Sequence, residues 1–375
     1  MKIGLVLERF DPQKGGLEHW TWQFARQLTE LGHEVHVIAF ESAKPVVGTR
    51  CVLHLLKPSS SRLRCAADIE EKLRSLQLDV IHDMGCGWYA DIFHPHGGST
   101  IALWEHNLMR IPRWRRIRFW REKRYRELAE IEKRQLACEK SVIVAVSKMV
   151  QGHFKTLHGL SGGRIRLIYN GVDTDRFSPQ YCGGFREPMR LELGCSDCET
   201  IFLLVAHNLL LKNAEAAIRA FSRLTVAGAS ARLVIVGGKR PARFVRLANK
   251  LGLSGRVSFF EPTSDVRPYY AAADVYLHPT WYDPCSLVAL EALACGLPVV
   301  TTRFNGVSEI MKDGLHGFIL GDPADVETLA RKMSVLLKPE LRAEMGKAAR
   351  RLALEHTFER QTEGFLSLYR EISHV

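Results

Sequence analysis

Residues 277–309 read LHPTWYDPCSLVALEALACGLPVVTTRFNGVSE, and this stretch decides the fold. Pro284 suits the first turn of a helix, and Asp283 or Ser286 can cap that helix. Gly296 predicts where the helix ends, because glycine readily adopts the left-handed conformation that closes many helices. The apolar runs on either side predict strands, so we expect the segment to fold as strand, helix, strand.

The start of this helix is a candidate anion site. The backbone N–H groups of Ser286, Leu287 and Val288 are expected to lack partners within the helix and to point beyond the strand end. Glu291 follows Leu287 by four residues, so both lie on one helix face, where a carboxylate can accept hydrogen bonds from ribose hydroxyls. An ordinary buried helix with a surface glutamate is the alternative interpretation.

The rest of the chain alternates short apolar strands with amphipathic helices, which predicts the α/β class. We expect two doubly wound, Rossmann-like domains with parallel sheets. The join is placed near Phe177–Cys182, giving domains of residues 1–177 and 178–357, with a helix at 358–375 that packs back on the first domain. Ligands of such sheets bind outside the carboxyl ends of the strands, so the cleft between the domains is the expected site. Strands are predicted at Lys2–Leu7, Glu34–Phe40, Val52–Leu56, Asp79–His82, Ser141–Val146, Ile165–Tyr169, Phe202–Ala206, Leu233–Val236, Val257–Phe260, Asp274–Leu277 and Pro298–Thr302, and helices at Leu17–Leu31, Ile69–Leu76, Ala214–Leu224, Ala242–Leu251 and Leu287–Cys295.

Composition excludes several classes of protein. The chain has 375 residues, 46% hydrophobic and 25% charged, so it is neither disordered nor collagen-like. No apolar run approaches the ~20 residues of a membrane-spanning helix, and the first residues turn polar too soon for a signal peptide. Nine cysteines, an odd number in a long chain, argue against a disulfide framework, and we expect reduced thiols in the cytosol.

A basic and aromatic strip stands out within the net charge of +11. Residues 101–150 hold 13 Lys/Arg against 6 Asp/Glu, which points to an anionic partner. A membrane surface or a phosphorylated glycan is expected, a solvated helix face is the plain alternative, and nucleic acid is disfavoured because no RNA- or DNA-binding motif accompanies the strip. The residues expected to meet membrane or acceptor are Arg110, Arg113, Trp114, Arg115, Arg116, Arg118, Trp120 and Arg121.

Taken together, these motifs resemble those of retaining GT-B glycosyltransferases, the large Glu-x7-Glu family that includes sucrose synthase, phosphatidylinositol mannosyltransferases and the lipopolysaccharide core glucosyltransferase I type. The matching segments, which run through almost the whole chain, are Gly15-Gly16-Leu17-Glu18, Leu31–Val35, Ala145–Ser147, Asn170–Asp173, Val205–Asn208 with Lys212, and Asp283-x7-Glu291 followed by Asn305–Glu309. The similarity to the core glucosyltransferase type is greatest in residues 259–284.

The resemblance implies a role for each matched residue in binding a nucleotide-sugar donor. Gly15 and Gly16 would let the backbone approach the donor diphosphate, and Lys212 would pair with it. Glu291 would hold the ribose, and Asp283 would face the hydroxyls of the donor sugar. The amides of residues 286–288 would contact phosphate or sugar.

The sequence departs from the family pattern at the donor site. The first glutamate of the family is Asp283 here, and the usual Gly-Arg is Ala206-His207. The usual glycine after Lys212 is Asn213. Neutralisation of the diphosphate is therefore expected to rest on Lys212 with help from His207 or Asn208.

His96, in the segment Asp91–Gly98, falls where the family often places a histidine or aspartate near the reacting carbon. A contact with the donor sugar, a structural loop histidine, and a metal ligand are the three possibilities, and no acidic or cysteine partners have the spacing of a metal site. Asp173-Thr174-Asp175 imitates a metal-binding DxD motif but is interpreted as a turn. The resemblance implies catalysis without metal.

We therefore expect an enzyme that transfers a hexose with retention, with glucose from UDP-glucose as the favoured donor and lipopolysaccharide core as the acceptor. Its expected place is the cytoplasmic face of the inner membrane. A mannosyl- or other hexosyltransferase acting on a lipid-linked, capsular or exopolysaccharide intermediate is the nearest alternative. A glycan-binding scaffold without catalysis is the second.

Overall fold

The computed structural model describes residues 1–42, 50–109, 122–196, 198–238 and 241–373. Its contacts divide the chain into unit 1, Met1–Tyr169 with Thr362–Val375, and unit 2, Asn170–Gln361. The division falls before the join expected near residue 177, because residues 170–172 bond to unit 2. Asn170 donates to the carbonyl of Cys285 (2.7 Å), and the Val172 amide donates to His356 (3.0 Å).

In the described part of unit 1, one seven-stranded parallel sheet has the order β5-β3-β1-β6-β7-β8-β9. Its strands are β1 (Lys2–Val6), β3 (Glu34–Ala39), β5 (Val52–Leu55), β6 (Val80–Asp83), β7 (Ile92–Phe93), β8 (Val142–Ala145) and β9 (Ile165–Leu167), and β2 (Arg9–Phe10) pairs with β4 (Glu41–Ser42). The helices are α1 (Gly16–Glu30), α2 (Arg62–Arg74), α3 (Thr100–Met109), α5 (Lys123–Ala137), α6 (Lys148–His158), η1 (Gly162–Arg164) and α15 (Phe358–Ser373).

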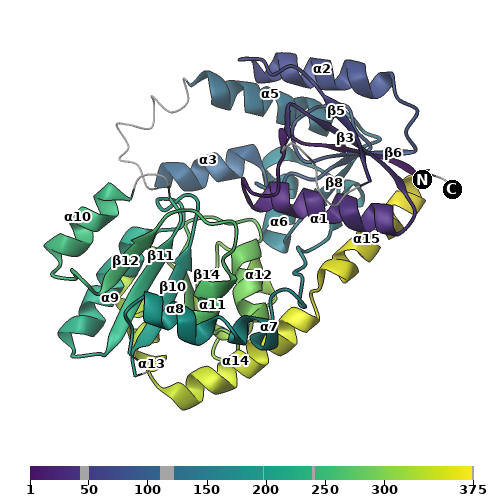
Figure 1. Ribbon diagram of the computed structural model, residues 1–375. Coiled ribbons are helices and arrows are strands. Elements are labelled where there is room, and N and C mark those ends of the chain that lie inside the picture. The colour runs from purple at the N-terminus through teal and green to yellow at the C-terminus, as the bar shows by residue number, and fades with distance from the viewer. Residues whose placement is uncertain (43–49, 110–121, 197, 239–240, 374–375) are drawn as a thin grey trace. The chain divides into compact units, whose positions relative to one another are not determined.

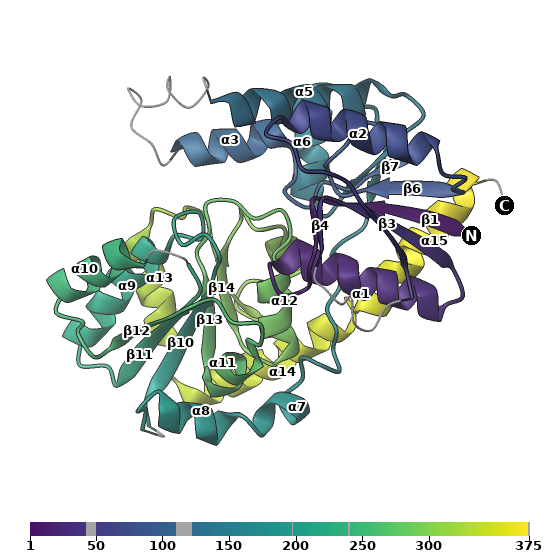
Figure 2. The ribbon, with the colours of Figure 1, turned by 45° about the horizontal axis from the view of Figure 1, so that its top comes forward.

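The two faces of the unit 1 sheet are covered by different helices. Strand side chains alternate between faces, so His82 meets Trp20 of α1 and Phe365 of α15, whereas Ile81 packs toward α2. Figures 1 and 2 both show α2 and α5 side by side. Helix α2 begins earlier than the expected Ile69, because Ser61 caps it by accepting the Arg64 amide at 3.4 Å.

Unit 2, in the residues that the structure describes, holds a six-stranded parallel sheet of order β12-β11-β10-β13-β14-β15. Its strands are β10 (Thr200–Val205), β11 (Ala231–Val236), β12 (Val257–Phe260), β13 (Val275–His278), β14 (Val299–Thr302) and β15 (Gly317–Leu320). The helices are α7 (Pro179–Gly183), α8 (Arg186–Glu192), α9 (Ala214–Val226), α10 (Ala242–Lys250), α11 (Arg267–Ala272), α12 (Leu287–Ala294), η2 (Gly306–Glu309), α13 (Val326–Val335) and α14 (Pro339–Leu354).

Helices cover both faces of this second sheet. Helix α9 packs against α10 and α13, while α11 packs on α7 and α8, and α12 on α14 (Figure 1). The core beneath α9 is made of apolar strand residues such as Phe202 and Leu233. The expected fold class, two doubly wound Rossmann-like domains with parallel sheets, is confirmed. None of the described helices is both long and apolar enough to span a bilayer.

Candidate functional site

The candidate site of unit 2 lies where the order of its strands reverses. Strand β10 connects through α9 to β11 on one side, whereas β13 lies on its other side and leads on to β14. Ligands of open α/β sheets bind outside the carboxyl ends of the strands at such a point. The segments that follow β10, β13 and β14 carry Lys212, Asp283 and Asn305, so the fold brings together residues far apart in the sequence.

Asp283 is held by two partners. Its Oδ2 lies 2.5 Å from Lys212 Nζ and 2.9 Å from His278 Nε2. Burial raises the pKa of the Asp283 carboxyl, but the Lys212 ammonium and the His278 N–H outweigh that effect, so the pKa lies well below its ordinary value. Asp283 is therefore ionised at neutral pH, with one oxygen engaged and its second, Oδ1, facing no hydrogen-bond partner among the described residues.

His278 was not singled out in the sequence, although it ends the strand that leads to Asp283. Burial lowers its pKa, and the nearby Lys212 adds to that effect against the opposing pull of Asp283, so the ring is neutral at pH 7. Its Nδ1 lies 3.3 Å from the hydroxyl of Tyr276, which also bonds the Val205 carbonyl at 3.2 Å. His278 thus fixes the position of Asp283 from within the sheet.

Lys212 is presented by a tight turn after β10. The Asn208 side chain accepts the Leu211 amide (3.1 Å), and its carbonyl accepts the Lys212 amide (3.0 Å). Asn213 follows with φ of 57°, the only positive φ of a non-glycine residue in the described chain, and asparagine tolerates this conformation better than most residues. His207 is exposed, and the hydrogen-bond partners of Lys212 and Asp283 in the described structure do not include it.

The start of α12 offers two free amides rather than the three expected. Ser286 caps the helix by accepting the Ala289 amide at 3.3 Å. The Ser286 amide itself donates to Oδ1 of Asn305 at 3.2 Å, which also accepts Val307. The expectation of a free Ser286 N–H is therefore wrong, because a side chain from the loop after β14 occupies it. Leu287 and Val288 keep amides for which the described residues offer no acceptor.

Glu291 lies one turn into α12 beside a tyrosine that sequence reasoning missed. The Tyr270 hydroxyl lies 2.9 Å from Glu291 Oε2 and 3.0 Å from the Val288 carbonyl. Burial raises the pKa of Glu291 to about 7, against the smaller lowering effect of the tyrosine and of Arg176. Tyr270 bonds only Oε2 of Glu291, and the other carboxylate oxygen, Oε1, has no hydrogen-bond partner among the described residues.

In unit 1, Gly15 and Gly16 form the start of α1. Gly15 is extended (φ −178°) and caps α1 without a side chain, and a Cβ on it would lie 2.6 Å from Glu18 Oε2. His96 lies near this helix, with its ring 4.6 Å from Trp20 and 4.0 Å from His94. Burial lowers the pKa of His96 to about 3, so it is neutral at pH 7.

His96 belongs to a group of three packed histidines. His82 and His94 rings lie 5.2 Å apart, and His82 Nδ1 bonds the Tyr369 hydroxyl at 2.6 Å. Buried ring nitrogens of all three have no hydrogen-bond partner in the described structure. Among the residues described, no three histidine, cysteine, aspartate or glutamate side chains are arranged to hold a metal ion.

The basic strip, Arg110 to Arg121, lies outside the described residues. Its expected contacts with a membrane or an acceptor therefore rest on the sequence. All nine cysteines are free thiols, and the sulfurs of Cys182 and Cys295 lie 3.5 Å apart.

Two family models match the chain. Glycosyltransferase Family 4 matches residues 14–176 and Glycosyl transferases group 1 matches residues 186–352. The D-inositol 3-phosphate glycosyltransferase of Mycobacterium tuberculosis is 33% identical over 227 residues, which is 57% of this chain and 45% of that protein. This chain thus spans just under half the length of the curated relatives it matches.

Solved structures share the whole fold at low sequence identity. WaaG, a glycosyltransferase involved in lipopolysaccharide biosynthesis, has a TM-score of 0.82 at 22% identity and covers 99% of both chains. HepE from Anabaena, solved in complex with UDP, has a TM-score of 0.75 at 18% identity and covers 99% of this chain and 100% of its own. At these identities the likeness establishes the fold.

Proposed function

We propose, on the premise that this chain belongs to the group 1 glycosyl transferases and has their GT-B fold, that it moves a hexose from a nucleotide sugar to a glycan hydroxyl. The observation that carries the proposal is the Lys212–Asp283 pair at the strand-order reversal of unit 2, next to the α12 amides of Leu287 and Val288. A cation and free amides in one place suit a diphosphate.

In the proposed reaction the donor diphosphate leaves as the bond from the anomeric carbon to its oxygen breaks. The Lys212 ammonium leaves Asp283 and pairs with the diphosphate. The amides of Leu287 and Val288 stabilise the negative charge that grows on the leaving group. The anomeric carbon bonds to the acceptor oxygen, and the hydroxyl proton passes to the departing phosphate. Asp283 Oδ1 and Glu291 Oε1 accept hydrogen bonds from donor sugar and ribose. The proposal includes retention of configuration and no metal, with Gly15, Gly16 and His96 contributing from unit 1.

The favoured donor is UDP-glucose and the favoured acceptor is lipopolysaccharide core. UDP is supported by the complex of HepE, and the acceptor by the likeness to WaaG. The M. tuberculosis relative supports a second candidate, transfer to an inositol phosphate. We place the enzyme at the cytoplasmic face of the inner membrane, on the strength of the basic residues among 101–150, each contributing ~1 kcal/mol near an anionic surface.

The test is a transfer assay with the full chain. Labelled UDP-glucose, UDP-galactose and GDP-mannose are each offered with truncated lipopolysaccharide core or with inositol phosphate, and products are separated by mass. Glucose transfer to the core supports the favoured pair. Transfer from GDP-mannose alone would replace the donor, transfer to inositol phosphate alone would replace the acceptor, and neither transfer nor hydrolysis across the panel would favour a binding scaffold.

A further inference from the structure

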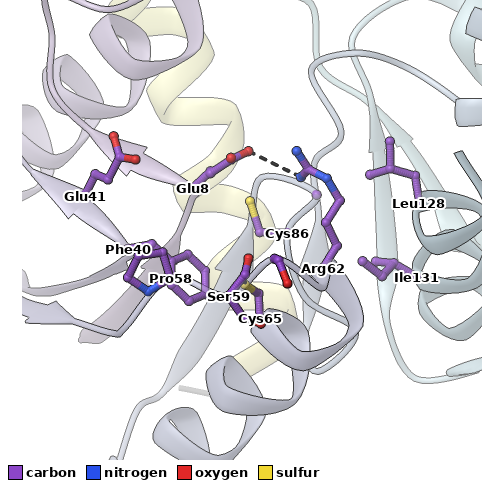
Figure 3. Close-up of a pocket in the computed structure, with 12 residues that line it drawn as sticks. Glu8, Phe40, Glu41, Pro58, Ser59, Arg62, Cys65, Cys86, Leu128 and Ile131 are labelled. Carbon is purple, nitrogen blue, oxygen red and sulfur yellow. Dashed lines mark hydrogen bonds and ion pairs between the residues drawn. The ribbon is translucent and has the colours of Figure 1, made fainter. Parts of the chain in front are cut away.

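A cavity of about 180 Å³ lies in unit 1, at the carboxyl ends of β1, β3 and β6 (Figure 3). Glu8 follows β1, Phe40 and Glu41 follow β3, and Cys86 follows β6, while Arg62 comes from the start of α2. The order of strands reverses between β1 and β6. The cavity therefore occupies the position in its sheet that ligands use in open α/β folds.

Protein carboxylates already occupy the backbone amides that could hold a phosphate here. Asp83 accepts the amides of Gly85, Cys86 and Gly87 at 2.6–2.7 Å. At the start of α2, Glu127 accepts the Arg62 amide at 3.0 Å and the Ser61 hydroxyl at 2.9 Å. The amides of this loop and the first amide of this helix are thus unavailable to a phosphate group.

The charged side chains at the cavity also disfavour an anion. Glu8 and Glu41 line it, and the one lining arginine, Arg62, lies 3.4 Å from Glu8 Oε2. Glu41 is paired with Arg9 at 2.6 Å. Burial is the main cause that raises the pKa of the Cys86 thiol in the cavity wall, and the carboxylates of Asp83 and Glu8 add to it against Arg62.

Glu8 and Arg62 together match a pair of neighbouring hydroxyls. A hydroxyl both donates and accepts a hydrogen bond, whereas a carboxylate only accepts and a guanidinium only donates. Their mutual contact is long and their side chains are 59% and 33% exposed, so both can still bond a ligand. An apolar wall of Phe40, Pro58, Leu128 and Ile131 completes the lining, and it suits the C–H face of a sugar ring.

We infer that this cavity binds one neutral, polyhydroxylated ring, the acceptor's terminal pyranose, with Glu8 and Arg62 as the residues that select it. The inference rests on the proposed function and deepens it, because it chooses a neutral sugar over a phosphorylated polyol as the group next to the reacting hydroxyl. The cavity volume of about 180 Å³ is large enough for several water molecules but is smaller than the ~300–1,000 Å³ of sites for larger ligands, so the cavity suits a single ring.

The experiment is saturation-transfer NMR on the full chain with methyl glucoside, methyl galactoside and myo-inositol, each compared with glucose phosphate and inositol phosphate. At least one of the two methyl glycosides is expected to bind at least about tenfold more tightly than glucose phosphate. The signal is expected to persist when UDP-glucose saturates the donor site. Tighter binding of a phosphate, no binding of either methyl glycoside, or displacement by UDP-glucose would overturn the inference.

Two variants of residues that line the cavity, with a matched control, test where the neutral ring binds. Glu8→Gln is expected to lower the affinity for the neutral ring about tenfold, since it removes a charge-assisted hydrogen bond. Cys65→Phe is expected to abolish binding of the ring by filling the cavity. Glu71→Gln, an exposed glutamate of α2, is the matched control and is expected to change nothing. Unchanged binding in both Glu8→Gln and Cys65→Phe would place the sugar elsewhere.

The same samples separate this inference from the proposed function. UDP is titrated into each variant by calorimetry. If the unmodified chain binds UDP but no sugar, the cavity assignment alone is wrong. If the unmodified chain does not bind UDP, the donor site in unit 2 is wrong, whatever the cavity binds.

Discussion

Asp283 and Lys212 were both selected from the sequence, yet their relation to each other was not. The sequence separates them by 71 positions, and only the parallel pairing of β10 with β13 brings their side chains together. His278 and Tyr270 were not selected as site residues for the same reason, and Asn305 was selected only as the first residue of the matched segment Asn305–Glu309. Each acts by a contact that depends on the fold and that a sequence motif does not show. The matched motifs thus selected Lys212 and Asp283 as candidates, whereas the hydrogen bonds that join and support them could be found only in the three-dimensional structure.

Replacing Lys212 with methionine is expected to reduce transfer by about 100-fold or more, as the loss of one transition-state donor does elsewhere. It also leaves the buried Asp283 charge without its cation, so stability is expected to fall by about 3 kcal/mol. Initial rates with saturating donor and urea unfolding measure the two effects. Lys347→Met, an exposed lysine of α14, is the control, and equal rates for both variants would remove Lys212 from the site.

The raised pKa of Glu291 predicts that the affinity for the donor depends on pH. Its pKa is raised to about 7 by burial, so the carboxylate gains a proton as pH falls from 8 to 6 and accepts the proposed hydrogen bond from the ribose less well. The donor KM is expected to rise several-fold over that range in the native enzyme and to stay flat in Glu291→Gln.

Tyr270→Phe provides the companion test. The tyrosine hydroxyl favours the charged form of Glu291, so its removal is expected to move the midpoint of the KM profile to higher pH. A midpoint that does not move, in a variant with normal unfolding, would show that another group titrates.

At the scale of elements, the sequence predicted the strands of the two sheets except β7 and β15, and helices such as α1, α9 and α12, because apolar periodicity and glycine stops are local signals. It placed the start of α2 too late, since its cap at Ser61 depends on Glu127 of α5, 66 residues away. The free amides of α12 were overcounted for a similar reason. Helix ends depend on side chains from other elements, which local patterns do not contain.

The start of α9 offers a test of backbone conformation. Asn213 has a left-handed φ of 57° and donates to the Pro323 carbonyl at 2.7 Å. Asn213→Ala is expected to cost about 2–3 kcal/mol, from strain and the lost hydrogen bond. Asn213→Gly loses only the hydrogen bond and is expected to cost about 1 kcal/mol. Urea unfolding compares them, and a glycine variant as unstable as the alanine variant would contradict this account.

At the scale of the whole molecule, two-domain α/β organisation followed from the repeated alternation of strands and helices. The position of the boundary did not, because Asn170 and Val172 bond to unit 2 through partners more than 100 residues away. Local patterns also do not contain the packing of the helix at 358–375 on the first domain, and in the structure Thr362–Val375 belongs to unit 1.

Unit 1 is expected to lose stability in acid. Burial lowers the pKa of His82 and of His96 to about 3, so below pH 6.5 the unfolded chain binds protons that the folded chain does not. Above pH 6.5 the effect is absent, and it grows as pH falls toward 3, reaching about 2 kcal/mol per histidine at pH 5. Urea unfolding at pH 7 and pH 5 measures it.

His94→Leu removes one of the three packed rings and is expected to make this loss shallower. His207→Asn, an exposed histidine of unit 2, is expected to leave it unchanged. The same slope in the native chain and in His94→Leu would mean that the acid sensitivity arises outside this group.

The way α15 completes unit 1 has a consequence for biosynthesis. Phe365 and Tyr369 are fully buried against Phe24 and His82 of the first hundred residues. The interior of unit 1 therefore stays unfilled while the ribosome makes all of unit 2, whose residues 170–361 are continuous. Although domains usually fold in the order of synthesis, here the unit that emerges first is the last to complete its core, and until then the side chains that α15 covers stay exposed.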